Sequence, residues 1–464
     1  MDERKLSALT AIDQVSGEIC ALSDAIWDVP ETAFLETTAT KLQCEALKNL
    51  GFEVEENLAG IPTAFSGRWG SGKPVIGILG EFDALAGLSQ KANATVKEPI
   101  VAGGNGHGCG HNLIGGGAIA AAYGIKEYLE ANGKSGTVIY FGCPGEEGGS
   151  GKAFMARDGV FDKLDAAFCW HPDSVNKVYT STHLANYQIL YKFDGIAAHA
   201  AAGPHLGRSA LDAVELMNMG VQFLREHIPT TCRIHYAITD AGGFSPNVVQ
   251  AHAEVLYLIR GVNNKVATEL YERVNDIAKG AALMTGTKES HQFIKACSNT
   301  IVNTPMMELL QEKMEAIPVP QPTEEQVDFA REMAKMLTNS PSADPEKPLN
   351  TNLQPLDHEK QGFGSTDVGD VSWVCPTAQI LTACVARGTP AHSWQWTAQC
   401  KTDLARNMTI YAAKVIAAAA TELMDNEELL QAAKADHAKR VGPDGYVPPI
   451  PQGAKPIALD SLRK

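Results

Sequence analysis

The segment His107-Gly-Cys-Gly-His111 holds the residues best suited to chemistry. Cys109 and His111 stand two residues apart, and the flanking glycines let the backbone fold closely round a site. Cysteine thiolate with histidine imidazole favours zinc or another late divalent ion. Taken alone, the pair could equally be a reactive thiol or a structural contact.

Two adjacent carboxylates and two further histidines strengthen the metal interpretation. Glu146-Glu147 follows the apolar run 137–141, while His171 and His392 follow the runs 166–170 and 379–386. In a parallel sheet the carboxyl ends of the strands meet at one edge, where ligands bind. Neighbouring residues of an extended chain point in opposite directions, so one glutamate can bind metal while the other acts as a general base. Without the histidines, a solvated turn would explain the pair as well.

The elements that must position these residues alternate over 1–185. Helix-like segments at 8–27, 37–50 and 114–129 separate short apolar runs at 75–79, 137–141 and 166–170. Such runs are typical of buried parallel strands. We therefore expect an α/β domain with a mostly parallel sheet.

From residue 186 the pattern becomes β-α-β-β-α-β, which is typical of a ferredoxin-like α+β unit. We expect an inserted domain at 186–298 and a discontinuous catalytic domain made of 1–185 and 299–464. The polar stretch 318–364 reads as a surface excursion with one helix, and no role is assigned to it.

Charge and composition exclude several classes of protein. The chain has 464 residues, with 39 Lys+Arg against 54 Asp+Glu and a formal net charge of −15. This acidic excess argues against nucleic acid and anionic membranes as partners. The N-terminus lacks the apolar core of a signal peptide, so we expect a cytoplasmic protein with reduced cysteines. The P-loop-like segment 67–74 ends in Pro74, where the motif needs Ser or Thr.

The residues resemble a known family, the metallo-amidohydrolases that include aminoacylases, carboxypeptidase-G-like enzymes and plant auxin-conjugate hydrolases. The resemblance covers nearly the whole length, including Gly80-Glu-Phe-Asp-Ala-Leu85, Gly108-Cys-Gly-His111 and Gly388-Thr-Pro-Ala-His392. Longer stretches, such as Cys143-Pro-Gly-Glu-Glu-Gly-Gly-Ser-Gly151 and Ser365-Thr-Asp-Val-Gly-Asp-Val-Ser-Trp373, are similar to the subgroup that acts on p-aminobenzoyl-glutamate.

This resemblance implies a role for each matching residue. The implied ligands of two divalent ions are Cys109, His111, Glu147, His171 and His392, with Glu146 as general base. The inserted domain is implied to be a dimerisation lid, from which His199, assisted by Asn247, reaches the active site of the other protomer. Arg260 is implied to bind the carboxylate of the released amino acid. Asn112, where many relatives have Asp, puts the orientation of His111 in doubt.

The resemblance also implies the reaction. We expect metal-dependent hydrolysis of the amide bond of N-acyl or aroyl amino acids, with p-aminobenzoyl-glutamate as the best single substrate. A dipeptidase, a hydrolase of other N-acyl amino acids, a weakly active partner chain of a heteromeric enzyme and a cysteine hydrolase are the alternatives. Thiolate ligation favours zinc, whereas the subgroup suggests manganese. We expect a homodimer, or a heteromer with a paralogous chain.

Overall fold

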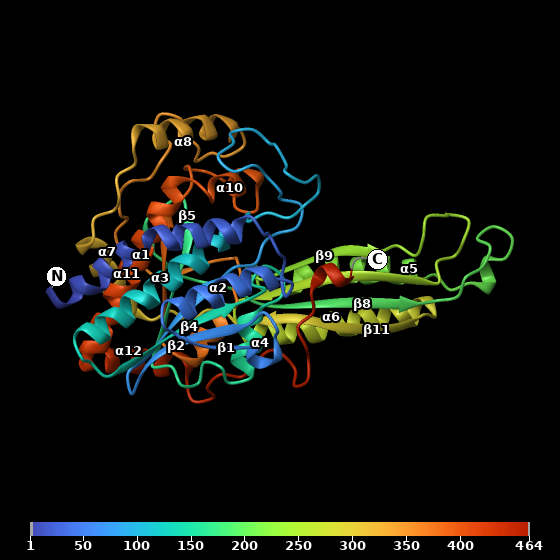
Figure 1. The fold of residues 1–464 in the computed structure, drawn as a ribbon. Helices are drawn as coiled ribbons and strands as arrows, with labels where there is room; N and C mark the ends of the chain where they lie inside the picture. The colour runs from blue at the N-terminus through green and yellow to red at the C-terminus, as the bar shows by residue number, and fades with distance from the viewer. Residues whose placement is uncertain (1–2, 463–464) are drawn as a thin grey trace. The chain divides into compact units, whose positions relative to one another are not determined.

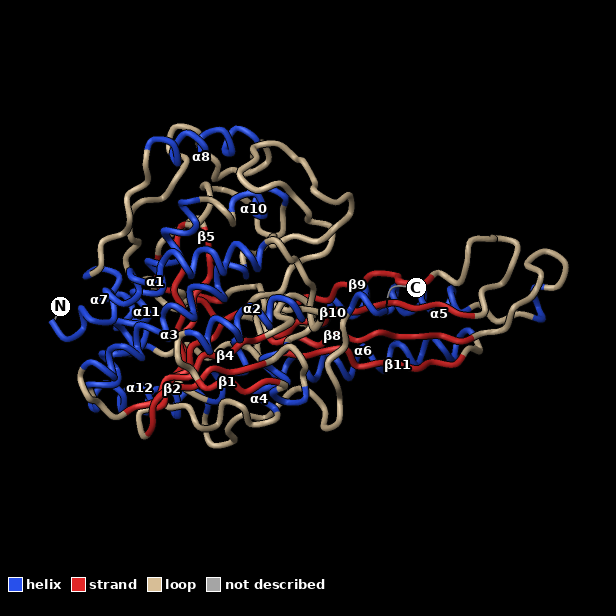
Figure 2. The backbone as a smooth tube through the Cα atoms, in the orientation of Figure 1, coloured by secondary structure: helices blue, strands red, loops and turns tan. Residues whose placement is uncertain are grey.

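A computed structural model describes residues 3–462 and divides the chain into two compact units. Of the described residues, the first contains 3–182, 301–360 and 371–446, and the second contains 183–300, 361–370 and 447–462. Figures 1 and 2 show the helices and strands of each. The short elements β7 (Ser181–Thr182), β12 (Lys360–Gln361) and α9 (Val368–Val374) lie where the chain passes from one unit to the other.

The first unit is built on a seven-stranded sheet with the order β1-β2-β4-β3-β5-β13-β6. Its strands are β1 (Glu53–Glu56), β2 (Phe65–Ser71), β3 (Val75–Glu81), β4 (Gly136–Cys143), β5 (Ala166–Asp173), β6 (Lys177–Val178) and β13 (Thr377–Ala383). The four central strands β4, β3, β5 and β13 are parallel, whereas β1, β2 and β6 add antiparallel pairs at the two edges. The expected α/β class is confirmed, but the parallel pairing is confined to the centre of the sheet.

Helices pack round this sheet and bury its apolar strands. They are α1 (Glu3–Trp27), α2 (Thr37–Asn49), α3 (His111–Ala131), α4 (Gly151–Arg157), α7 (Thr304–Ala316), α8 (Glu324–Met336), α10 (Trp394–Gln399), α11 (Asp403–Asp425) and α12 (Glu427–Val441). Helix α3 is buried along most of its length, and its small residues Gly116, Gly117 and Gly124 allow close approach of α1 and Trp170. None of the helices within residues 3–462 has the length and apolar character needed to cross a bilayer.

The second unit has the predicted order of elements: β8 (Ala185–Asp194), α5 (Ala210–Leu224), β9 (Arg233–Asp240), β10 (His252–Gly261), α6 (Asn264–Thr285) and β11 (Lys288–Cys297). All pairs of its sheet, ordered β11-β8-β10-β9, are antiparallel. Alternate residues of β8, namely Tyr187, Ile189, Tyr191 and Phe193, are buried in the core of this unit. This arrangement is the expected ferredoxin-like α+β insertion.

Two segments that the sequence placed in the first domain lie with this second unit. In segment 361–370, Ser365 contacts Arg260 and donates to the carbonyl oxygen of Leu184. In segment 447–464, Leu459 and Leu462 line a pocket together with residues of β8, β9 and β10. Both segments therefore contact residues of the inserted sheet that are remote from them in the sequence.

Candidate metal centre

The predicted metal ligands converge at the carboxyl edge of the central strands. Glu146 and Glu147 follow β4, and His171 lies within β5, at its carboxyl end. His111 is the first residue of α3, three residues earlier than the predicted start of that helix. His392 precedes α10 with a φ of 57°, and its backbone nitrogen donates to the carbonyl oxygen of Gly108. That hydrogen bond joins the two segments that carry Cys109 and His392.

The donor atoms of these side chains lie at ligand-like separations. Three of the sets whose potential ligand atoms lie within 4.8 Å of one another consist of these residues: Cys109 with His111 and His171, Cys109 with Glu147 and His392, and His111 with Glu146 and Glu147. The Cys109 Sγ to His171 Nε2 distance is 3.4 Å, and the His392 Nε2 to Glu147 Oε1 distance is 3.2 Å. The structure thus brings together all five predicted ligands and Glu146.

Two orphaned atoms show that these residues fit a divalent metal. His111 Nε2 and Glu147 Oε1 are buried, lie 3.8 Å apart, and have no well-aligned hydrogen-bond partner within residues 3–462. Buried polar atoms are normally paired. A thiol, three imidazoles and a carboxylate also form a donor set suited to zinc or manganese.

The electrostatics favour Cys109 as a ligand over Cys109 as a nucleophile. Burial, together with the nearby Glu147 carboxylate, raises the pKa of the Cys109 thiol well above its usual value. Without a cation this thiol therefore stays protonated and unreactive, and a bound divalent ion is what would deprotonate it. The pKa of Glu147 is held at about 2: burial opposes ionisation, but the neighbouring imidazoles of His392 and His111 outweigh it.

Asp83 orients two of the ligands, a role that the sequence did not assign to it. This buried carboxylate accepts a hydrogen bond from His111 Nδ1 at 2.8 Å and another from the backbone nitrogen of Glu147 at 2.9 Å. His111 Nε2 is thereby turned toward the metal centre. Asn112 instead donates to Ser23 and to the carbonyl oxygen of Cys400, so its side chain takes no part in orienting His111. The position of Asp83 after β3 was the available signal.

His199 and Asn247 lie together in exposed loops of the second unit. The backbone nitrogen of Ala200 donates to the carbonyl oxygen of Asn247, and His199 pairs with Val248. The Nδ1 atom of His199 accepts hydrogen bonds from two backbone nitrogens, at 3.2 and 3.1 Å. Its proton therefore resides on Nε2, which can donate to a substrate oxygen.

Arg260 lies far from His199 within the same unit. In β10 the residue next to the His199 loop is His252, which pairs with Asp194, whereas Arg260 is eight positions further on and pairs with Asn186. At about 3.3 Å per strand residue this separation is roughly 26 Å. Arg260 Nη1 donates to Ser365 Oγ at 2.7 Å, and burial lowers the pKa of its guanidinium. One copy of this unit therefore does not bring His199 and Arg260 together.

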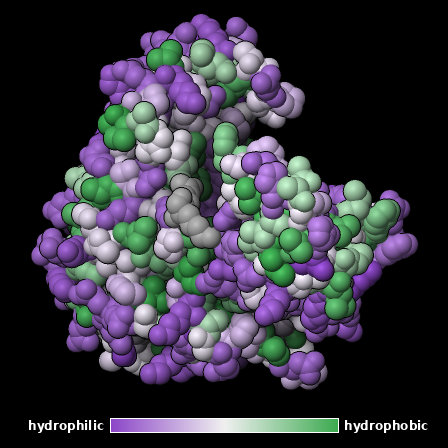
Figure 3. Space-filling model, turned by 90° about the vertical axis from the view of Figure 1, so that its right-hand side faces the viewer, coloured by the Kyte–Doolittle hydropathy of each residue, from purple (hydrophilic) through white to green (hydrophobic). Residues whose placement is uncertain are grey.

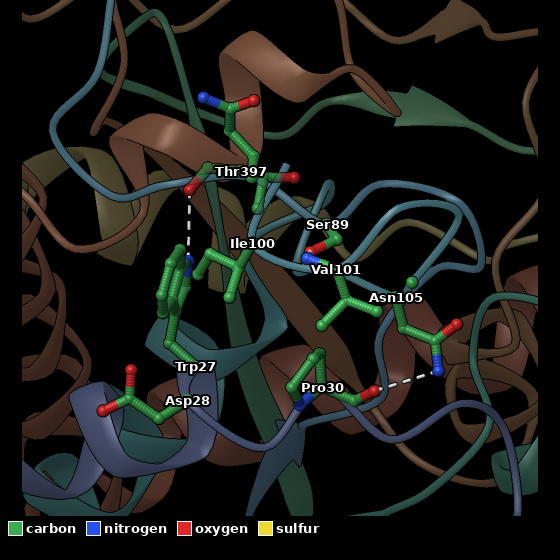
Figure 4. Close-up of a pocket in the computed structure, with 11 residues that line it drawn as sticks. Trp27, Asp28, Pro30, Ser89, Ile100, Val101, Asn105 and Thr397 are labelled. Carbon is green, nitrogen blue, oxygen red and sulfur yellow. Dashed lines mark hydrogen bonds between the residues drawn. The ribbon is translucent and has the colours of Figure 1, made fainter. Parts of the chain in front are cut away.

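A separate pocket of about 280 Å³ lies beside the segment that leads into the metal centre. Figure 4 shows Trp27, Pro30, Ile100 and Val101 turned toward it, with Trp27 donating a hydrogen bond to the carbonyl oxygen of Thr397. None of the predicted ligands lines this pocket. It is therefore distinct from the metal centre.

Comparison with known proteins identifies the class of protein. The sequence profile of peptidase family M20/M25/M40 matches residues 77–454. The chain belongs to this family of metal-dependent hydrolases.

Two individual relatives show which members of the family this chain resembles in sequence. The chain is 44% identical over 462 residues to one of the subunits of p-aminobenzoyl-glutamate hydrolase from Escherichia coli, covering 94% of this chain and 95% of the relative. It is 30% identical over 448 residues to the mouse Xaa-Arg dipeptidase, covering 92% of this chain and 90% of the relative.

Solved structures agree in fold. An aminobenzoyl-glutamate utilization protein from Klebsiella pneumoniae has a TM-score of 0.57 at 16% identity and covers 86% of this chain and 96% of its own. A dinuclear metal-binding peptidase of the M20 family from Bacillus subtilis has a TM-score of 0.56 at 16% identity. The match covers 89% of this chain and 99% of that structure's chain.

Proposed function

We propose that this chain hydrolyses the amide bond of p-aminobenzoyl-glutamate to p-aminobenzoate and glutamate. The observation that carries the proposal is the convergence of five ligand side chains beside Glu146 in a chain 44% identical to one component of that hydrolase. The mouse relative favours a second candidate reaction, the cleavage of a dipeptide. Both reactions break an amide bond and release a free amino acid.

The metal ligands in this proposal are Cys109, His111, Glu147, His171 and His392, shared between two divalent ions. Bound divalent ions would lower the pKa of water and polarise the scissile carbonyl group. Glu146 removes the proton from the attacking water and delivers a proton to the leaving amine nitrogen. The Nε2 proton of His199, assisted by Asn247, stabilises the oxyanion that forms on the carbonyl oxygen. Arg260 binds the carboxylate of the released amino acid through its planar fork.

His199 and Asn247 act in trans in this proposal, so two chains complete each active site. Their loops expose large apolar side chains: Leu206 is 66% exposed, Phe244 is fully exposed and Val248 is 43% exposed. Phe223 on α5 and Leu283 on α6 are also exposed, and Figure 3 shows hydrophobic patches on an otherwise mainly hydrophilic face. Exposed apolar patches are typical of interaction surfaces.

A homodimer is proposed, and a heteromer with a paralogous chain is the alternative. A second component of the E. coli p-aminobenzoyl-glutamate hydrolase is 27% identical to this chain over 185 residues, covering 39% of this chain and 42% of the relative. Such a paralogue could supply the second copy of the inserted unit. Sedimentation of the purified chain alone distinguishes the two, because a homodimer forms without any other protein.

The reaction is tested by measuring glutamate release from p-aminobenzoyl-glutamate by the purified chain alone. The protein is first stripped of metal and then given manganese or zinc in separate samples. We expect turnover to return with at least one of the ions. If neither ion restores glutamate release, while an Xaa-Arg dipeptide is cleaved, the proposed aroyl substrate is wrong and the chain acts as a dipeptidase.

The trans arrangement is tested by mixing two inactive variants. Glu146→Ala and His199→Ala chains are each expected to be inactive alone, because each lacks one part of every site. Coexpressed, they form mixed dimers in which one of the two sites has both intact residues. Recovered turnover supports action in trans; if the mixture stays inactive although mixed dimers form, His199 acts on its own chain.

A further inference from the structure

A buried ion pair borders the metal centre and is not used by the proposed mechanism. Glu81 is the last residue of β3 and is 6% exposed, and Lys152 in α4 is fully buried. Lys152 Nζ lies 2.7 Å from Glu81 Oε1. Burying two charges costs desolvation energy that their mutual attraction repays only when the geometry is good.

The second carboxylate oxygen of Glu81 faces the same atom that is orphaned at the metal centre. Glu81 Oε2 lies 3.4 Å from His111 Nε2. Two donors bound to one tetrahedral ion through bonds of about 2.1 Å lie about 3.4 Å apart. The proposed ligand pairs Cys109 with His171 and Glu147 with His392 show nearly the same separations, 3.4 and 3.2 Å. The distance from Glu81 Oε2 to His111 Nε2 is therefore that expected for two ligands of the same ion.

The backbone holds Lys152 in this place. A Cβ atom at Gly151 would lie only 2.0 Å from the carbonyl oxygen of Pro144, so α4 begins in direct contact with the turn that carries the two glutamates. Lys152 is the next residue of this helix, and its Nζ reaches Glu81 Oε1 at the end of β3. Because Lys152 engages Oε1, Glu81 Oε2 remains directed at His111 Nε2.

We propose that Glu81 is a sixth protein ligand of the metal centre, and that Lys152 is a positioning residue that orients it. The inference rests on the proposed function only in requiring that the centre binds divalent ions. A carboxylate adds a hard oxygen donor to a set otherwise rich in sulfur and nitrogen. Glu81 therefore widens the range of divalent ions that the centre can hold, manganese as well as zinc.

The test compares metal binding by the full-length wild type and the Glu81→Gln variant. Metal-stripped protein is titrated with Mn²⁺ or Zn²⁺ against a chelating indicator, and bound metal is counted by mass spectrometry. The amide keeps the size of the side chain but loses its charge. We expect the dissociation constant of one ion to rise by about 10-fold or more, because even the loss of a group that only supports a ligand costs that much. The rise should be larger for manganese than for zinc.

Asp165→Asn is the matched control. Asp165 is another buried carboxylate paired with lysines, Lys73 and Lys434, but it does not contact the metal centre. Its affinities should match those of the wild type. Glu81→Asp, which keeps the charge but shortens the reach, should lie between the wild type and Glu81→Gln, and it is the variant to use if Glu81→Gln does not fold.

The outcomes separate the inference from the proposed function. If wild-type protein binds no divalent ion, the proposed metal-dependent function fails. If wild type binds metal and Glu81→Gln, or Glu81→Asp in its place, binds the same ions with the same affinity, Glu81 is not a ligand. The visible absorption spectrum of the Co²⁺-loaded protein gives a second readout, because a lost ligand changes it whereas a purely structural role leaves it unchanged.

Discussion

Glu36 is a buried carboxyl group whose replacement should change how stability depends on pH. It is fully buried, its Oε1 accepts a hydrogen bond from the backbone nitrogen of Gly145 at 2.8 Å, and its Oε2 has no well-aligned hydrogen-bond partner within residues 3–462. Burial, with the nearby Asp83 carboxylate, raises the pKa of Glu36 from 4.5 to about 8. Between these values the folded protein keeps a proton that the unfolded chain loses.

The sign and size of the effect follow from this difference. The free energy of unfolding falls as pH rises from about 4.5 toward 8, because ionisation favours the unfolded chain. The full penalty is of the order of 5 kcal/mol, and about 2 to 3 kcal/mol of it develops between roughly pH 5 and 7. Glu36→Gln retains an acceptor for Gly145 and cannot ionise. Its stability relative to wild type should therefore increase over that interval.

The assay is urea unfolding at several pH values, followed by circular dichroism, on metal-stripped protein in chelator. Metal must be absent because bound cations would lower the pKa of Glu36. Glu31→Gln, the same substitution at the carboxylate that accepts hydrogen bonds from the first turn of α2, controls for the amide itself. A stability difference that stays constant, or that shrinks as pH rises, would refute the assignment of a neutral buried Glu36.

Three further predictions concern the segment round His111. Asp83→Asn should weaken metal binding by about 10- to 100-fold, because it disturbs the acceptor that orients His111, and unchanged affinity in a chelator competition would contradict this. Cys109→Ser should lower zinc affinity more than manganese affinity, since it removes the soft thiolate, and equal losses in metal titrations would argue against thiolate ligation. Gly110→Ala should destabilise the fold by about 2 kcal/mol or more, because φ is 79° and the new Cβ would lie 2.7 Å from Pro172, and an unchanged urea midpoint would contradict this.

Much of the fold could be predicted because its apolar residues follow a clear period. The runs that became β3, β4, β5 and β13 are short and apolar, and the alternation in β8 identified the inserted unit. The pair β1 and β2 was missed because Gly67 and Gly70 interrupt β2 and most of β1 is exposed. Helix α12 was missed because it is polar and buries only Leu430 and Ala433.

The residues that hold the site together were harder to predict than the ligands. Cys109 and the two glutamates stand out through their types and spacing. Asp83, Glu81 and Glu36 act through contacts with residues that are remote in the sequence, namely Glu147, Lys152 and Gly145. Such contacts depend on the packing of β3, α4 and α2, which no local pattern encodes.

The most direct test of the proposed chemistry is to measure metal content and p-aminobenzoyl-glutamate turnover together in Glu146→Ala. Glu146 is proposed to move protons and not to bind metal. We expect the variant to keep the metal content of the wild type and to lose turnover by about 10²- to 10⁴-fold. Wild-type turnover with full metal content would contradict the proposal, because the hydrolysis would then need no base at this position.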